Sequence, residues 1–134
     1  KGAAGEDVRR RIEEAFRLTF TGDRSQRDVR KASELLQPIC ATPDASATCE
    51  RILGYVAVSS GFDVPRAFKH YGRAVELEPD YGEAHYALAF MHAMKDRTAG
   101  KTHYDRALSL GVPDTRGLSR FYGAPGTPKP TTGH

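Results

Sequence analysis

The stretch YGRAVELEPDYGEAHYALAF, from Tyr71 to Phe90, decides the fold that this sequence predicts. Apolar residues recur at helical spacing before Pro79, and again directly after Gly82. A proline lacks the backbone N–H and clashes with the preceding turn, so it ends a helix that the apolar pattern would otherwise continue. The stretch therefore predicts two helices joined by a short turn, which is the usual connection between antiparallel neighbours.

Amphipathic segments fill most of the chain. Apolar residues at three- and four-residue steps predict helices over about residues 6–20, 29–38, 47–60, 65–78, 82–95 and 101–110, with a short last helix at 115–122. Pro38 is expected to end the second helix, and Pro65 to lie in the first turn of the fourth. No segment alternates for long enough to predict a strand. The sequence therefore predicts an all-α fold, followed by an irregular Gly/Pro-rich tail at residues 123–134.

The segment RAFKHYGRAVELEPD matches AGKTHYDRALSLGVPD, because His70, Tyr71 and Leu77 are each followed 33 residues later by the same residue type. A self-match of about 34 residues in helix-turn-helix segments is typical of tetratricopeptide repeats. The chain resembles this family at its Leu-Gly, small, aromatic and proline positions: Leu53, Gly54, Ala67, Tyr71, Ala74 and Pro79 in one unit, and Ala84, Leu88, Ala89, Tyr104 and Ala107 in the next. The family's large aromatic position is Glu50 in one unit and His85 in the other. The Sel1-like variant of the same repeat class is the alternative.

The resemblance implies a right-handed α-α superhelix of about three units, over residues 6–38, 47–79 and 81–113, in one repeat domain at 6–122. Each unit is too small to bury its apolar face alone, so consecutive units are expected to stack. The turn at Pro79 is then the boundary between two units, which explains why one helix stops there and the next begins at once.

Charge and hydropathy exclude several functions. The net charge is +3, from 20 basic and 17 acidic residues, which is too balanced to predict nucleic-acid binding. No apolar run approaches the roughly 18 residues that span a bilayer, so no membrane insertion is expected from this segment. The sequence begins at Lys1 and not at Met, which is compatible with earlier removal of a signal peptide or anchor.

Two cysteines, Cys40 and Cys49, flank a loop between the second and third predicted helices. Their spacing differs from the C-x-x-C of redox and haem motifs, and two cysteines alone make a poor zinc site. A disulfide across a loop of about 10 residues would contribute roughly 2–3 kcal/mol. It would also indicate an extracytoplasmic location, in a periplasm or on a cell surface, as in the soluble part of a lipoprotein. The alternative is two free thiols that face apart.

Enzymatic motifs are absent from the sequence. The serines lack the glycine context of a nucleophile elbow, and neither a phosphate-binding loop nor G-x-G-x-x-G occurs. His85 and His92 share a helix face near two methionines, but packed histidines are the favoured interpretation over a metal site. The sequence therefore predicts a protein that is not an enzyme and has no cofactor and no metal.

Protein binding is the function that the resemblance implies, because in stacked repeats the first helix of each unit lines a groove. The candidate peptide-binding residues are Arg10, Arg17, Arg51, Tyr55, Tyr86 and Phe90. Such a surface suits an extended peptide with acidic and hydrophobic residues. Two alternatives stay open: the arginines pair with glutamates along their own helix, and the aromatic rings are buried against a neighbouring helix.

The predicted function is a non-enzymatic adaptor that binds another protein or an extended peptide and helps assemble a cell-envelope complex. The alternative is a structural subunit of a self-assembling envelope or filament complex. The sequence specifies neither the partner nor the oligomeric state.

Overall fold

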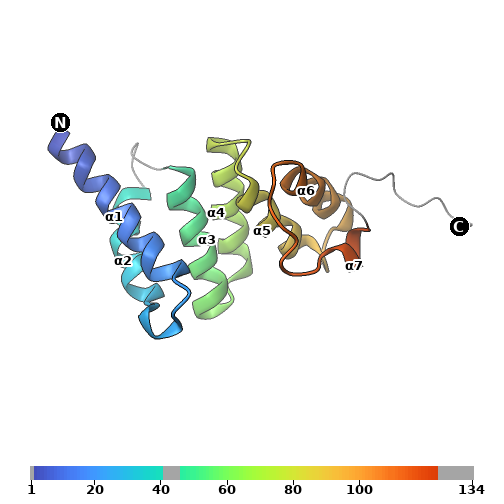
Figure 1. The fold of residues 1–134 in the computed structure, drawn as a ribbon, viewed down its shortest axis with the longest axis horizontal. Coiled ribbons are helices and arrows are strands. Elements are labelled where there is room, and N and C mark those ends of the chain that lie inside the picture. Colours follow the sequence, from blue (N-terminus) through green and yellow to red (C-terminus); the bar gives the residue numbers. More distant parts are fainter. Residues whose placement is uncertain (1, 41–45, 124–134) are drawn as a thin grey trace, which may run out of the picture. The chain divides into compact units, whose positions relative to one another are not determined.

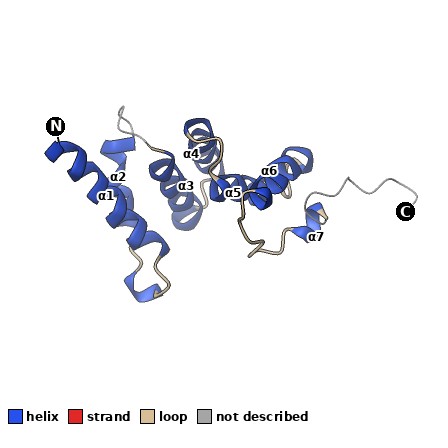
Figure 2. Ribbon diagram, turned by 45° about the horizontal axis from the view of Figure 1, so that its top comes forward, coloured by secondary structure: helices blue, strands red, loops and turns tan. Residues whose placement is uncertain are grey.

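The computed structural model describes residues 2–40 and 46–123 of the 134-residue chain, and every regular element within these ranges is a helix, with no strand (Figures 1 and 2). The elements are α1 (Gly2–Phe20), η1 (Arg24–Gln26), α2 (Val29–Cys40), α3 (Ala47–Gly61), α4 (Val64–Leu77), α5 (Gly82–His92), α6 (Arg97–Ser109) and α7 (Ser119–Tyr122). The predicted all-α class is confirmed. The chain divides into two compact units, Lys1–Pro79 and Asp80–His134, which are described separately below.

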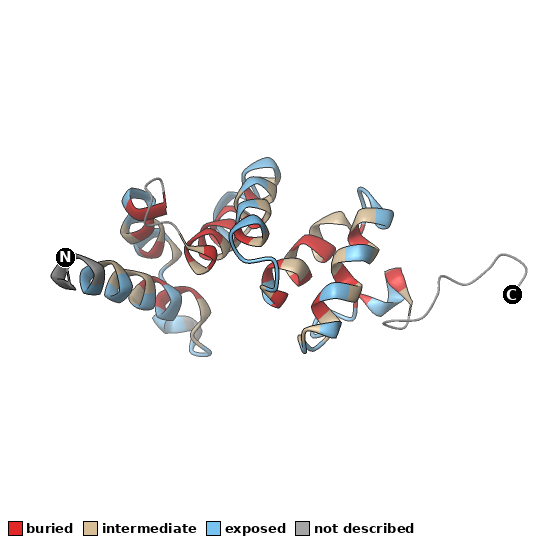
Figure 3. Ribbon diagram, turned by 90° about the horizontal axis from the view of Figure 1, so that it is seen from above, coloured by how far each residue is buried: buried red, intermediate tan, exposed pale blue. Residues whose placement is uncertain are grey.

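The first unit packs α1 on α2, α2 on α3, and α3 on α4 (Figure 1). Small side chains let the helices approach closely, because Ala15, Ala32, Ala67 and Ala74 are fully buried. The larger side chains of the core are Leu18, Leu36, Ile39, Ile52, Leu53 and Val56. Figure 3 shows the buried residues on the helix faces that meet, with exposed residues on the outer faces.

The hairpin of α3 and α4 has clear local signals. The Ser46 hydroxyl accepts from the backbone N–H of Cys49 at the start of α3, and the Asp63 carboxylate accepts from the N–H of Arg66 at the start of α4. These caps satisfy backbone donors that have no partner within the helix. Gly54 meets Tyr71, because a Cβ at Gly54 would lie 3.0 Å from the Tyr71 ring. The absence of a side chain at Gly54 thus leaves room for the aromatic ring of Tyr71.

The second unit is a hairpin of α5 and α6 with the short α7 packed against α6. Its core contains Tyr86, Ala89, Ala93, Tyr104, Ala107, Leu118 and Tyr122. Gly100 is buried where the Tyr122 side chain crosses α6, and a Cβ there would collide with the Tyr122 hydroxyl. That hydroxyl donates to the backbone carbonyl of Ala89 at 2.6 Å, so one residue of α7 contacts both helices of the hairpin.

Several predicted boundaries are wrong. Pro38 lies inside α2, which continues to Cys40; the proline is exposed, so the carbonyl that loses its donor can be solvated. The fifth helix ends at His92 and not at Lys95, and α6 begins at Arg97. The early start of α6 follows from Asp96, whose carboxylate caps the helix by accepting from the N–H of Ala99 at 3.1 Å.

The two ends of the chain also differ from the prediction. The first helix begins at Gly2 and not near residue 6. The last helix is shorter than predicted and covers only Ser119–Tyr122. Of the predicted tail, Gly123 caps α7 with a positive φ of 80°, and residues 124–134 lie outside the described residues.

Candidate functional site

Three aromatic rings and one guanidinium gather where α1 and α3 meet. Phe16 and Phe20 lie one helical turn apart on α1, with ring centroids 4.9 Å apart, and Phe20 contacts Tyr55 of α3 at 5.1 Å. The guanidinium of Arg51 lies 4.4 Å from the Phe20 centroid and 5.7 Å from that of Phe16. We call these four residues the aromatic–arginine cluster. Two of them, Arg51 and Tyr55, were predicted as binding residues, and the structure brings these two together.

The cluster reaches the surface. Phe16 is 39% exposed, and Phe20, Arg51 and Tyr55 are half-buried. Neither Phe16 nor Phe20 was among the predicted binding residues. The four-residue spacing of the two rings is the signal that could have found them, since residues i and i+4 are neighbours on a helix surface.

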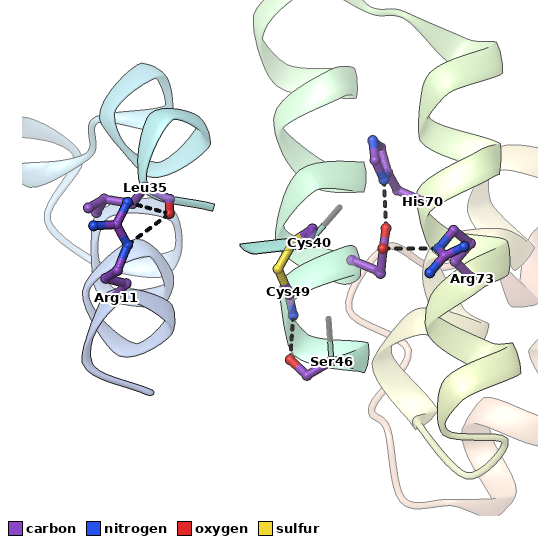
Figure 4. Close-up of a disulfide and its surroundings, with 8 residues drawn as sticks. Arg11, Leu35, Cys40, Ser46, Cys49, His70 and Arg73 are labelled. Carbon is purple, nitrogen blue, oxygen red and sulfur yellow. Dashed lines mark hydrogen bonds and ion pairs between the residues drawn. A yellow bond between two sulfur atoms is a disulfide. The ribbon is translucent and has the colours of Figure 1, made fainter. Parts of the chain in front are cut away.

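The other two predicted arginines of this unit lie exposed on α1. Arg17 forms a bidentate pair with Glu14, at 3.1 and 2.7 Å, which is the helix-surface pairing that the sequence left open. The hydrogen bonds from Arg17 lower the pKa of the Glu14 carboxyl. Arg11, by contrast, joins α1 to α2 by donating to the backbone carbonyl of Leu35 at 3.3 and 3.2 Å (Figure 4).

In the second unit, Tyr86 is only 6% exposed, so it has little surface for a peptide. Its hydroxyl donates to Asp114 at 2.7 Å and accepts from the backbone N–H of Arg116, also at 2.7 Å. Burial raises the pKa of the Tyr86 hydroxyl, and its hydrogen bond to Asp114 raises it further. Tyr86 therefore holds the segment between α6 and α7.

Asp114 is the centre of that arrangement. Besides Tyr86, it accepts from the Tyr104 hydroxyl at 3.2 Å and from the backbone N–H groups of Leu118 and Ser119 at 2.7 and 3.0 Å. Burial alone would raise the pKa of this carboxyl, but the hydrogen bonds together lower it. Asp114 was not among the residues predicted for a site.

Phe90, the last predicted binding residue, is half-buried in the same unit. The guanidinium of Arg116 lies 4.3 Å from its ring centroid, which is within the range of a cation–π contact. Phe90 thus repeats, within the second unit, the combination of aromatic ring and arginine that defines the cluster of the first unit.

A buried carboxylate lies between α3 and α4. Glu50 is 1% exposed and has a charged or ionisable partner at each oxygen: His70 Nδ1 at 2.7 Å from Oε1, and Arg73 Nε at 3.0 Å from Oε2. Figure 4 shows His70 and Arg73, each joined by a dashed line to the carboxylate of α3. A buried glutamate is costly unless it is paired, and here both oxygens are satisfied.

Glu50 lines an open pocket of about 530 Å³ whose lining residues come from α2, α3, α4 and the turn between α3 and α4. Residues of α3 supply the apolar part of the lining, Leu53, Val56 and Ala57 among them, and α4 supplies Arg66, Lys69, His70 and Arg73. Sequence reasoning missed this pocket. The available signal was the acid at position 50, where the family that the sequence resembles has a large aromatic residue.

Cys40 of α2 and Cys49 of α3 lie at disulfide distance, with 6.0 Å between their Cα atoms, and both are buried (Figure 4). The predicted pairing is confirmed, and the free-thiol alternative is not what the structure shows. The pair joins the last turn of α2 to the first turn of α3.

Three histidines gather between α5 and α6. Nδ1 of His85 lies 2.9 Å from Nδ1 of His103, and the rings of His92 and His103 stack with centroids 6.0 Å apart. Burial, and then the neighbouring His85 and His92, lower the pKa of His103 to about 4. Within the described ranges, no group of three or more His, Cys, Asp or Glu residues has the arrangement of a metal site. His85 contacts His103 of α6, just as Glu50 contacts His70 of α4, so each side chain lies against a histidine of the next helix along the chain.

Within residues 2–40 and 46–123, no helix combines the length and apolar character needed to cross a bilayer. Comparison of the chain with protein-family models, with curated proteins and with solved structures found no match.

Proposed function

We propose that this chain is a non-enzymatic interaction module of the tetratricopeptide-like class, which binds an extended acidic and apolar peptide at the aromatic–arginine cluster. The observation that carries the proposal is the partly exposed set of Phe16, Phe20, Arg51 and Tyr55 on two neighbouring helices. Tyr and Phe offer large contact areas with few rotatable bonds, and Arg and Tyr are enriched among residues that dominate binding energy.

The charge of the surface supports the acidic character of the peptide. Arg51 lies against the rings, and Arg10 and Arg17 lie exposed on α1. A guanidinium that stacks on an aromatic face can still direct its edge toward a carboxylate, because the two contacts use different sides of the planar group. A peptide with an acidic side chain beside an apolar one would satisfy both parts of the cluster.

The repeat assignment has its own support. The α3–α4 and α5–α6 hairpins each have fully buried alanines, Ala67 and Ala74 in the first and Ala84, Ala89 and Ala107 in the second. The Tyr71 and Tyr104 positions, 33 residues apart, are both buried. Similar packing in two successive hairpins is expected of repeated units.

The paired cysteines support an extracytoplasmic site of action, where disulfides persist. We place the module in a periplasm or on a cell surface, as part of an envelope assembly. This part of the proposal predicts that the native protein resists thiol alkylation unless it is first reduced.

The experiment is a selection of peptides from a phage-displayed random dodecapeptide library on the immobilised protein. We expect enrichment of peptides that combine Asp or Glu with apolar residues. Fluorescence anisotropy with a selected peptide should show that Arg51→Gln or Phe16→Ser weakens binding by about tenfold or more. The matched control is Phe62→Ser, which removes another exposed phenyl ring outside the cluster and should leave the affinity unchanged. Selected peptides without acidic residues, or equal loss in the control, would contradict the proposal.

A self-assembling structural subunit is the second candidate, and three exposed apolar side chains favour it. Phe62 is 67% exposed, Leu77 47% and Met94 83%. Light scattering after size exclusion separates the two candidates. A mass that grows with protein concentration, and that falls when Phe62 is changed to Ser, would support self-assembly, whereas a constant monomer mass supports the adaptor.

A further inference from the structure

The pocket between α2, α3 and α4 has an unequal distribution of charge. Arg66, Lys69, His70 and Arg73 follow one another at steps of three, one and three residues, which places them on one face of α4. The acids in the lining are Glu50 and Asp63. With His70 neutral, the three cations exceed the two carboxylates by one positive charge.

Both acids are already engaged by protein groups. The two oxygens of Glu50 contact His70 and Arg73, at 2.7 and 3.0 Å, so the buried carboxylate is neutralised in place. Asp63 caps α4 through the N–H of Arg66 and lies 3.5 Å from the Arg66 guanidinium. The cations keep more donor capacity, because Arg73 uses its Nε on Glu50 and a guanidinium has five N–H donors.

The geometry of the lining defines the ligand further. The volume, about 530 Å³, lies in the range of roughly 300–1,000 Å³ that small-molecule sites occupy. One wall is the cationic face of α4, and the α3 side carries Leu53, Val56 and Ala57. We propose that this pocket binds a small organic oxyanion, whose carboxylate or phosphate group contacts Lys69 and Arg73 and whose short apolar part lies on α3.

Glu50 has a positioning role in this site. The Glu50 carboxylate contacts Nε of Arg73 and Nδ1 of His70, and so fixes the positions of two side chains in the pocket wall. Lys69 is exposed, which makes it the cation that can be changed without disturbing the core. The site does not depend on the peptide surface, because it uses none of the four residues of the aromatic–arginine cluster.

The test is an NMR titration of the isotopically labelled full chain with four probes: acetate, butanoate, inorganic phosphate and butyl phosphate. Ionic strength is held constant with sodium chloride. We expect saturable shifts confined to the pocket residues of α2, α3 and α4. Butanoate and butyl phosphate should bind about tenfold more tightly than acetate and inorganic phosphate, because they bury additional methylene groups. The better of the two alkyl probes identifies the headgroup.

Two variants make the result specific. Lys69→Gln should weaken binding of the alkyl anions severalfold, and Lys69→Glu should abolish it, because the reversed charge repels the ligand. The matched control is Lys31→Gln, which removes an exposed lysine of α2 that does not line the pocket, and it should bind as the wild type does. Linear shifts spread over surface lysines and arginines, or equal affinity in Lys69→Glu, would overturn the proposal.

The outcome is independent of the peptide-binding proposal. Phe16→Ser should leave anion binding unchanged, and Lys69→Glu should leave binding of the selected peptide at the cluster unchanged. Loss of anion binding in Phe16→Ser would contradict the assignment of the anion to the pocket.

Discussion

Glu50 is a buried carboxylate of α3 whose two oxygens contact His70 and Arg73 of α4. Removing one member of a buried charged pair is costly, because the other charge stays out of water without a partner. Arg73 is about half exposed, so the cost is smaller than for a fully buried pair. The Glu50 carboxylate, at 2% side-chain exposure, is the member that cannot be rehydrated in place.

We predict that Arg73→Ala lowers the free energy of unfolding by about 1–2 kcal/mol. Adding Glu50→Leu to this variant should recover most of the loss, because no buried charge then remains unpaired. Chemical denaturation of the two single variants and the double variant measures the coupling. Arg66→Ala is the control, since its pair with Asp63 is exposed and should contribute less than about 0.5 kcal/mol. Additive losses in the double variant would contradict this account.

Gly100 and Gly72 provide a second test at single residues. Both lie inside helices, where replacing Gly by Ala normally stabilises by roughly 0.5–1 kcal/mol. A Cβ at Gly72 meets nothing within 4 Å, but one at Gly100 collides with Tyr122. We therefore expect Gly72→Ala to raise the free energy of unfolding and Gly100→Ala to lower it by about 1–3 kcal/mol. The same sign for both substitutions would show that Tyr122 does not pack against α6 as described.

At the scale of elements, α5 and α6 are joined through three histidines. The pKa of His103 falls from its ordinary value of 6.5 to about 4 on folding, because burial and the facing His85 and His92 disfavour the charged form. Between pH 6.5 and 4 the unfolded chain therefore binds more protons than the folded chain. The free energy of unfolding must then fall as the pH is lowered through this window.

We predict that His103 accounts for about 1–2 kcal/mol of stability that is present at pH 7 and lost by pH 4, after allowance for solvent screening. His103→Gln should flatten the pH dependence of unfolding between these values, because the amide keeps a hydrogen-bonding group beside His85 without titrating. Denaturant unfolding of both proteins at several pH values measures the difference. Parallel pH curves would remove the histidine contact as the cause.

Elements were also what the sequence predicted best. Pro79 and Gly82 marked the turn between α4 and α5, and the apolar stripes located the hairpins 47–79 and 81–113 closely. The boundary errors have local causes: Pro38 is tolerated at an exposed turn of α2, and Asp96 starts α6 earlier than the apolar pattern does. Such effects depend on solvation and capping geometry, which apolar periodicity does not report.

The sites were predicted less well, because they depend on contacts between distant residues. Arg51 and Tyr55 were selected, but Phe16 and Phe20 join them only when α1 packs beside α3. Tyr86 was predicted to lie on a binding surface, whereas its hydroxyl donates a hydrogen bond to Asp114, which lies 28 residues further along the chain. The contacts of Glu50 with α4 span 20 and 23 residues. No local pattern in the sequence predicts these contacts.

At the scale of the whole molecule, the Cys40–Cys49 pair lies in one of two compact units. Closing a loop of about 10 residues contributes roughly 2–3 kcal/mol, chiefly by restricting the unfolded chain. Reduction should therefore lower the hydrogen-exchange protection of α2 and α3. The protection of α5 and α6 should stay unchanged, since these two helices belong to the other unit. Hydrogen exchange with mass spectrometry, with and without reductant, measures this. The Cys40→Ser/Cys49→Ser variant should behave like the reduced protein, and uniform loss across both units would contradict the division.

The surface of α1 and α3 is the site at which we propose that an acidic and apolar peptide binds. NMR mapping of a library-selected peptide on the labelled full chain tests this most directly. The account predicts saturable shifts at Phe16, Phe20, Arg51 and Tyr55 and their neighbours, and loss of these shifts in Arg51→Gln. Shifts confined to the α2–α4 pocket or to α5–α7, or shifts that persist unchanged in Arg51→Gln, would contradict it.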